Sequence, residues 1–184
     1  MTSMAKTEWP SNFGPSYTPE QMLRRGIFEG VYIQPIRGLP SGWKSLDKVL
    51  PSGTEPDVTI NEFGVKSSQP KSEWVRKGWI MTDSEGWFHW YIKFFLGRRL
   101  GEEDDKQIGR WRSFVARHAG QLKSNCSLGD TKCSPKQRQG LLQWAWDSRV
   151  EFTEKTVTAN ARRMANATNV KISTEEYSPI YIDW

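Results

Sequence analysis

One stretch decides the fold of this chain: Gly86-Trp87-Phe88-His89-Trp90-Tyr91-Ile92-Lys93-Phe94-Phe95-Leu96-Gly97-Arg98-Arg99. No other segment has such a density of large apolar side chains. On a helix these side chains cover nearly the whole circumference, and only His89 and Lys93 form a polar stripe. A helix that is apolar nearly all round is wrapped by other elements, and each buried aromatic ring removes about 150–250 Å² from water. The stretch therefore predicts a central, buried helix.

Further helices are expected on both sides of the central one. Their predicted ranges are Pro19–Arg25, a short helix around Trp74 that ends before Gly78, Glu102–Leu122, a helix opened by Ser134-Pro135, and Thr156–Ala167, with a short possible helix at Lys44–Leu50. Thr18 and Gln21 fit a capping box, and Asp83 or Ser84 is expected to cap the central helix. The run from Ile27 to Ile36 fits either a short strand or a buried loop.

The predicted fold class is mainly α: a single compact helical domain around the central aromatic helix. Its irregular N-terminal third is expected to contain one small strand pair. The chain of 184 residues is long enough for one domain with a real core and too short for two. Residues 1–17 form an extended N-terminal arm that docks by Trp9 and Phe13, and residues 18–184 form the domain. The tail Val170–Trp184 carries enough apolar area to dock as well.

The net charge of +5 favours polyanionic partners, which are nucleic acid, phosphorylated molecules or anionic lipid. The sequence shows no apolar run of 18 residues and no signal-peptide pattern, so neither a membrane span nor secretion is predicted. The predicted location is intracellular, either cytoplasmic or nuclear. The sequence does not predict an oligomeric state.

Cys126 and Cys133 are the two cysteines of the chain. A disulfide across this short loop is sterically possible, but free thiols are expected in a reducing compartment. A zinc site would need two more ligands, and His89 and His118 lie on separate predicted helices. The sequence therefore predicts no metal and no other cofactor.

Arginine and aromatic residues alternate along the two central helices, a pattern that favours nucleic-acid or nucleotide-phosphate binding because arginine binds phosphate and aromatic rings stack on bases. The predicted anion-binding residues are Arg98, Arg99, Arg110, Arg117, Lys136 and Arg138, together with Trp90 and Trp111, the tryptophans most expected to be exposed. The competing interpretation is structural: Arg110 and Arg112 pair with Glu102, Glu103, Asp104 or Asp105, and the other cations form a solvated face. If Arg98 and Arg99 bind a ligand, their double replacement by Gln should leave the thermal midpoint nearly unchanged.

Two further functions compete with nucleic-acid binding. One is a small enzyme that acts on an anionic or aromatic molecule, with arginines as anchors, His89 or His118 as general acid or base, and Tyr91 as a hydrogen-bond donor. The third is a protein-interaction module that uses a tryptophan-rich surface. For either histidine, a hydrogen-bonded role in the core is the simpler alternative. The familiar hydrolase, metalloprotease, P-loop and dinucleotide motifs are absent from the sequence.

Three motifs carry a resemblance to known proteins. They are Gly86-Trp87-Phe88-x-Trp90-Tyr91, then Leu96-Gly97-Arg98-Arg99, then Asp105-x-Gln107-Ile108-x-Arg110-Trp111. With Lys136-Gln137-Arg138-Gln139 and Leu141-Leu142-Gln143-Trp144, the chain resembles a widespread family of short, tryptophan-rich hypothetical proteins. The likeness covers most of residues 19–149. It implies no particular activity, so the functional predictions rest on the chemistry of the residues.

Overall fold

The aromatic stretch forms helix α3, Trp87–Phe95, in the computed structural model, which describes residues 8–46 and 55–173. Its buried side chains are those of Trp87, Phe88, Trp90, Tyr91, Ile92 and Phe94, so the prediction of a central buried helix is confirmed. The predicted cap is wrong. Gly86, with φ at 87°, is the N-cap residue, and Asp83 instead accepts hydrogen bonds from Arg98.

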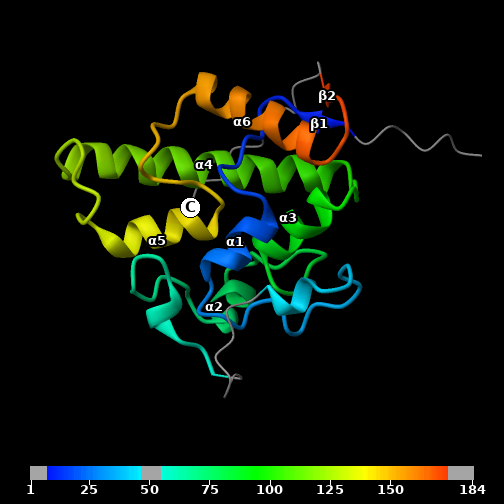
Figure 1. Cartoon of the computed structure of the whole chain (residues 1–184), viewed down its shortest axis with the longest axis horizontal. Coiled ribbons are helices and arrows are strands. Elements are labelled where there is room, and N and C mark those ends of the chain that lie inside the picture. Colours follow the sequence, from blue (N-terminus) through cyan, green and yellow to red (C-terminus); the bar gives the residue numbers. More distant parts are fainter. Residues whose placement is uncertain (1–7, 47–54, 174–184) are drawn as a thin grey trace, which may run out of the picture.

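The described part of the chain is a mainly helical single domain with six α-helices. The other helices are α1 (Pro19–Arg25), α2 (Lys71–Arg76), α4 (Glu102–Asn125), α5 (Pro135–Gln143) and α6 (Glu154–Ala167), with 3₁₀ turns at Trp43–Ser45 and Val58–Ile60. The long helix α4 crosses the whole molecule in Figure 1, with α6 on one side of it and α1, α3 and α5 on the other. The predicted helical fold is therefore confirmed.

Local sequence signals place the helix ends well. Thr18 and Gln21 form the predicted capping box of α1, and Gly26 ends that helix in the left-handed conformation with φ at 69°. The segment from Ile27 to Ile36 is the buried loop rather than the strand, because it is built from turns around the buried Ile27, Ile33 and Ile36. Of the possible helix at Lys44–Leu50, residues 47–50 lie outside the described ranges.

Phe13, from the predicted arm, lies at the centre of the aromatic core. Its ring centroid is 5.5 Å from that of Trp9 and 5.0 Å from that of Trp111, and both Trp9 and Phe13 have no exposed surface. Further rings around it belong to α3, at centroid distances of 5.6 Å for Trp90 and Tyr91. Aromatic pairs at these distances are favourable beyond the area they bury. The two rings dock as predicted, and the segment that carries them is part of the core.

A two-stranded parallel sheet joins this arm to the chain after α6. Strand β1 (Trp9–Pro10) pairs with β2 (Ile172–Ser173), with Trp9 opposite Ile172. A small strand pair is present, but only β1 belongs to the N-terminal third, so its predicted location is wrong in part. Residues 174–184, where the apolar tail is predicted to dock, lie outside the described residues.

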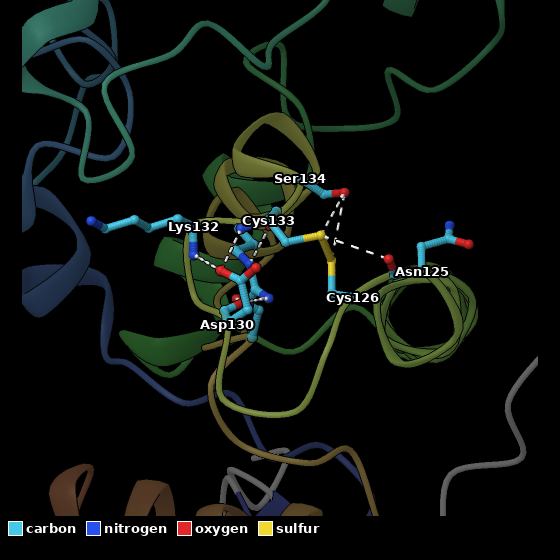
Figure 2. The surroundings of a disulfide bond; sticks show 8 residues. Asn125, Cys126, Asp130, Lys132, Cys133 and Ser134 are labelled. Carbon is cyan, nitrogen blue, oxygen red and sulfur yellow. Dashed lines mark hydrogen bonds between the residues drawn. A yellow bond between two sulfur atoms is a disulfide. The ribbon is translucent and has the colours of Figure 1, made fainter.

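Cys126 and Cys133 form a disulfide, so the expectation of free thiols is wrong. The loop between α4 and α5 turns back sharply, and the two Cα atoms are 5.8 Å apart, within the range that a disulfide requires. Figure 2 shows Asp130 inside this loop, where its carboxylate accepts hydrogen bonds from the backbone N–H groups of Lys132 and Cys133. The turn that Asp130 stabilises brings the two sulfur atoms together.

Candidate functional site

A cavity of about 710 Å³ lies between α4, α5, the start of α3 and the segment that contains α2. Its lining includes eight aromatic residues: Phe28, Tyr32, Trp74, Trp79, Trp87, Phe88, Phe114 and Trp144. Four lining residues are cationic, Lys77, Arg110, Arg117 and Lys136, against the single carboxylate of Glu85. Small-molecule sites have such volumes and such largely apolar walls with a few placed polar groups.

Helix α4 supplies one wall because Arg110, Phe114, Arg117 and His118 recur at helical spacing and share one face. The rings along this wall are in contact. The His118 ring lies 4.2 Å from Phe114, whose ring stacks on Trp144 at 4.7 Å. Trp144 in turn stacks on Trp87 at 4.9 Å, which connects the wall to α3. These contacts form a continuous row of rings along this side of the cavity.

The four cations differ in their burial. Arg110 is only 4% exposed, donates hydrogen bonds to the Trp79 carbonyl and to Gln107 Oε1, and lies 5.7 Å from the Trp144 ring centroid. Burial lowers the pKa of Arg110 to about 10, so it stays cationic at neutral pH. Arg117 and Lys136 are exposed, one on α4 and the other on α5. Both can therefore reach an anion at the rim of the cavity.

His118 is oriented by its neighbours. The Gln137 amide nitrogen lies 2.8 Å from His118 Nδ1 and also donates to Gln121 Oε1. Because an amide nitrogen only donates, Nδ1 accepts and the proton of the neutral ring lies on Nε2. Burial, and then the charge of Arg117, lower the pKa of His118 below its ordinary value of 6.5. His118 is thus a neutral N–H donor at neutral pH.

The segment with α2 covers the cavity without entering the core. No residue of α2 is buried. Polar contacts tie the segment to the rest of the domain: Ser67 Oγ donates to the Lys136 carbonyl at 2.8 Å, and Gln143 Nε2 donates to Ser68 Oγ at 2.9 Å. The segment is therefore joined to the start of α5 and to its end by polar contacts.

Arg98 and Arg99, predicted to bind an anion, are in contact with the protein itself at the end of α3. The Arg98 guanidinium donates to both carboxylate oxygens of Asp83. Arg99 donates to the carbonyls of Phe94 and Glu8, and its guanidinium lies 3.6 Å from the Phe94 ring centroid. The structure therefore does not bring this pair together with Arg110, Arg117 and Lys136.

Three more predicted residues lie away from the cavity. Arg138 is 6% exposed and donates to the carbonyls of Cys133 and Asp130, so it holds the disulfide loop. Trp90 and Trp111 have no exposed surface, and their N–H groups donate to Asp104 Oδ1 and to the Trp144 carbonyl. The expectation that one of these two rings is exposed is wrong, because both are needed to fill the core around Phe13.

The predicted catalytic residues are not brought together. His118 lines the cavity, whereas His89 Nδ1 accepts a hydrogen bond from the Glu85 N–H at 3.3 Å and lies outside the lining. Tyr91 is fully buried and donates its hydroxyl to the Tyr17 carbonyl at 2.8 Å. Burial raises the pKa of Tyr91 well above its ordinary value of 10. His118 is the one of the three that a ligand in the cavity can contact.

Sequence reasoning missed part of the lining. Trp74, Trp79 and Trp144 fit a core role by composition, yet all three are only half-buried and face the cavity. The available signal was the close spacing of Trp74, Lys77 and Trp79, an aromatic and basic cluster on a short helix and the turn that follows it. Lys77 Nζ lies 4.6 Å from the Trp79 ring centroid.

Within residues 8–46 and 55–173, no three or more histidine, cysteine, aspartate or glutamate side chains gather to form a potential metal site. Over the same ranges, no helix is both long enough and apolar enough to span a membrane. Comparison of the chain with protein-family models, with curated proteins and with solved structures gives no match. The function is therefore argued from the cavity alone.

Proposed function

We propose that this protein binds a small molecule with a planar ring system and an anionic group. A single observation carries the proposal: one cavity of about 710 Å³ combines eight aromatic side chains with four cations and a single carboxylate. Aromatic faces stack on planar rings, and cations bind phosphate or carboxylate. Nucleotide phosphates and aromatic acids both have this chemistry.

The ring and the anionic group of such a ligand bind in different parts of the cavity. The ring stacks in the region of Phe114 and Trp144, where the wall is aromatic and already ordered by its own contacts. The anionic group lies toward Arg117 and Lys136, which lie on two different helices and are solvent-exposed. His118 Nε2–H adds a neutral donor between ring and anion. Of these groups, His118 is held in place by its contact with the Gln137 amide.

A small ligand fits the geometry better than a nucleic-acid strand. An extended nucleic-acid surface needs cations spread along a groove that tracks the backbone. Here Arg98 is committed to Asp83 and Arg138 to the carbonyls of the disulfide loop, while Arg110 is buried in the cavity wall. Of the cations predicted to bind an anion, the exposed Arg117 and Lys136 both line this one cavity.

The proposal is tested by calorimetric titration with probes that separate ring from charge. AMP and 1-naphthoate carry both features, adenosine and 1-naphthalenemethanol carry only the ring, and inorganic phosphate carries only the charge. We expect AMP or 1-naphthoate to bind, with the matched neutral compounds at least about tenfold weaker, since each charged hydrogen bond contributes about 1.5–3 kcal/mol. Inorganic phosphate alone should bind weakly, because it has nothing to stack.

Substitutions of the two exposed lining cations test whether the anionic group binds at the proposed position. Arg117→Gln with Lys136→Gln should weaken binding of the anionic probe and leave the neutral ring compounds unaffected. Lys123→Gln is the matched control, because Lys123 is also an exposed cation of α4 but pairs with Glu151 at 3.1 Å and does not line the cavity. If no probe binds while single-stranded oligonucleotides bind with a steep salt dependence, the nucleic-acid function replaces this one.

A second candidate function, catalysis, is favoured by His118. This histidine lies in the cavity wall, and Gln137 sets the tautomer in which its Nε2–H can donate a hydrogen bond to a substrate oxygen that gains negative charge during a reaction. A library of chromogenic aromatic esters and phosphates tests it: His118→Gln should abolish turnover and preserve binding of AMP or 1-naphthoate. If none of these substrates is turned over, ligand binding without catalysis remains the proposed function.

A further inference from the structure

The disulfide lies directly beside the proposed ligand site. Cys126 follows the last residue of α4, and Cys133 precedes Ser134, the residue from which α5 begins. Figure 2 shows the two sulfur atoms bridging the end of α4 and the loop that leads into α5. The bond therefore connects the two helices that carry Arg117, His118, Lys136 and Gln137 to the cavity.

Hydrogen bonds make the loop and the start of α5 one unit. The Asp130 N–H donates to the Ser127 carbonyl at 3.0 Å, and the Asp130 side chain caps the turn. Arg138, on the second turn of α5, donates to the carbonyls of Cys133 and Asp130 at 2.7 Å each. The buried guanidinium of Arg138 thus links the loop to α5, so a change in the loop also affects α5.

The first turn of α5 belongs to the cavity. Ser134, Pro135, Lys136 and Gln137 all line it. Lys136 is one of the two rim cations, and Gln137 is the residue that orients His118. Ser134 itself has φ at 53°, a conformation that residues other than glycine rarely adopt and that the surrounding structure must hold. The covalent bond at the neighbouring residue helps to hold it.

We propose that the Cys126–Cys133 disulfide is a redox switch that controls ligand affinity: the oxidised protein holds Lys136 and Gln137 in the binding arrangement, and reduction releases them. This inference rests on the proposed function, because it concerns the affinity of the same cavity. The reduced chain samples more arrangements of the loop, and binding must select the one that orders the rim.

The chemical step is a thiol–disulfide exchange with a dithiol reductant. A thiolate of the reductant attacks one sulfur of the disulfide and forms a mixed disulfide while the other cysteine leaves as a thiolate. The second thiol of the reductant then displaces the remaining cysteine. Two electrons and two protons pass to the protein, and the reductant becomes a cyclic disulfide. Residues 127–132 between the cysteines are all exposed, so the reductant can approach.

The experiment compares the affinity of the full chain for AMP and for 1-naphthoate in the oxidised state, after reduction with dithiothreitol, and in a Cys126→Ser/Cys133→Ser variant. We expect the reduced protein and the variant to bind about fivefold or more weakly than the oxidised protein, a coupling of ordinary size between two sites. The chain has two cysteines only, so dithiothreitol should not change the affinity of the serine variant.

Reciprocity gives a second measurement that does not depend on the variant. If oxidation strengthens binding fivefold, a saturating probe must favour the disulfide by the same factor and lower its reduction potential by about 20 mV. Equal affinities of the oxidised and reduced chain, with an unchanged potential, would overturn the switch and leave the ligand site intact. If the oxidised protein binds neither probe, the proposed ligand-binding function is refuted, and the redox switch that rests on it is refuted as well.

Discussion

The Arg98 guanidinium donates two hydrogen bonds to the carboxylate of Asp83, a residue that is only 5% exposed. This pair links the end of α3 to the segment that precedes the helix. The hydrogen bonds from Arg98 satisfy a nearly buried carboxylate, whose desolvation is otherwise costly. Both terminal N–H groups of Arg98 are thus used in the contact with Asp83, which gives this residue a structural role.

Arg98→Gln should lower the free energy of unfolding by about 3 kcal/mol, because it leaves the nearly buried carboxylate of Asp83 without its counter-charge. Asp83→Asn should cost less, because the side chain of Arg98 that it leaves behind is 28% exposed. Urea denaturation measures the loss. Glu73→Gln is the control, since Glu73 and Arg76 form an exposed pair on α2, and such pairs contribute little to stability. Equal effects of the three substitutions would contradict the structural role of Arg98.

Gly14→Ala should destabilise the protein strongly. A Cβ atom at Gly14 would lie 1.9 Å from the carbonyl oxygen of Val157, a backbone atom of α6 that cannot move aside by itself. We expect a loss of about 3 kcal/mol or more, as for severe overpacking of a core. Thermal unfolding of the purified variant measures it.

Gly120→Ala is the matched control for Gly14→Ala and should have the opposite sign. Gly120 lies inside α4 and is exposed, and a Cβ atom added at this position would have no neighbouring atom within 4 Å. Replacing a mid-helix glycine by alanine stabilises by about 0.8 kcal/mol. A destabilising Gly120→Ala would show that α4 is strained at this point.

The free energy of unfolding should fall as the pH falls below about 6.5. Burial lowers the pKa of both His89 and His118 in the folded protein. The unfolded chain therefore binds protons at a higher pH than the folded one, so the contribution of each neutral histidine is fully present above pH 6.5 and is lost through the lower, folded pKa. Urea denaturation between pH 5 and pH 8 measures the slope, and His118→Gln should reduce it without removing it. A slope that is unchanged in this variant would contradict the contribution of His118.

Asp104→Ala should cost about 2 kcal/mol. Its buried carboxylate accepts hydrogen bonds from Trp90 Nε1 at 2.8 Å and from the Leu100 N–H at 2.6 Å. Removal of the carboxylate leaves the buried indole N–H without an acceptor, which costs the desolvation of that group. Asp105→Ala, at the adjacent and more exposed position, is the control and should cost less. A comparable loss in both would assign the effect to the helix start rather than to Trp90.

The elements with local causes could be predicted from the sequence. The aromatic stretch makes α3 central because its side chains are apolar around the circumference, and Thr18 with Gly26 bounds α1 by capping chemistry that involves only nearby residues. Contacts between distant residues could not be predicted in this way. Nothing within a few residues of Phe13 indicates that α3 and α4 surround it.

The candidate site was predicted only in part for the same reason. Arg110, Arg117 and His118 share one face of a regular helix, so their proximity follows from spacing. Arg98 has an equally basic local sequence, but its partner Asp83 lies before the helix and fits a cap equally well by pattern. Trp144 lies just beyond α5, where no periodicity applies, and its exposure depends on how α4 and α5 pack.

The parallel pairing of β1 with β2 has a consequence for the order of events during synthesis. Trp9 leaves the ribosome long before the residues of β2, yet its backbone N–H donates to the Lys171 carbonyl at 2.9 Å in the finished domain. The Phe13 ring likewise lacks its partners on α3 and α4 until those helices have been synthesised. A nascent chain therefore cannot complete its interior from the N-terminus onward, and β1 stays unpaired until α6 and β2 have emerged. The pairing of β1 with β2 is thus a late step of folding during synthesis.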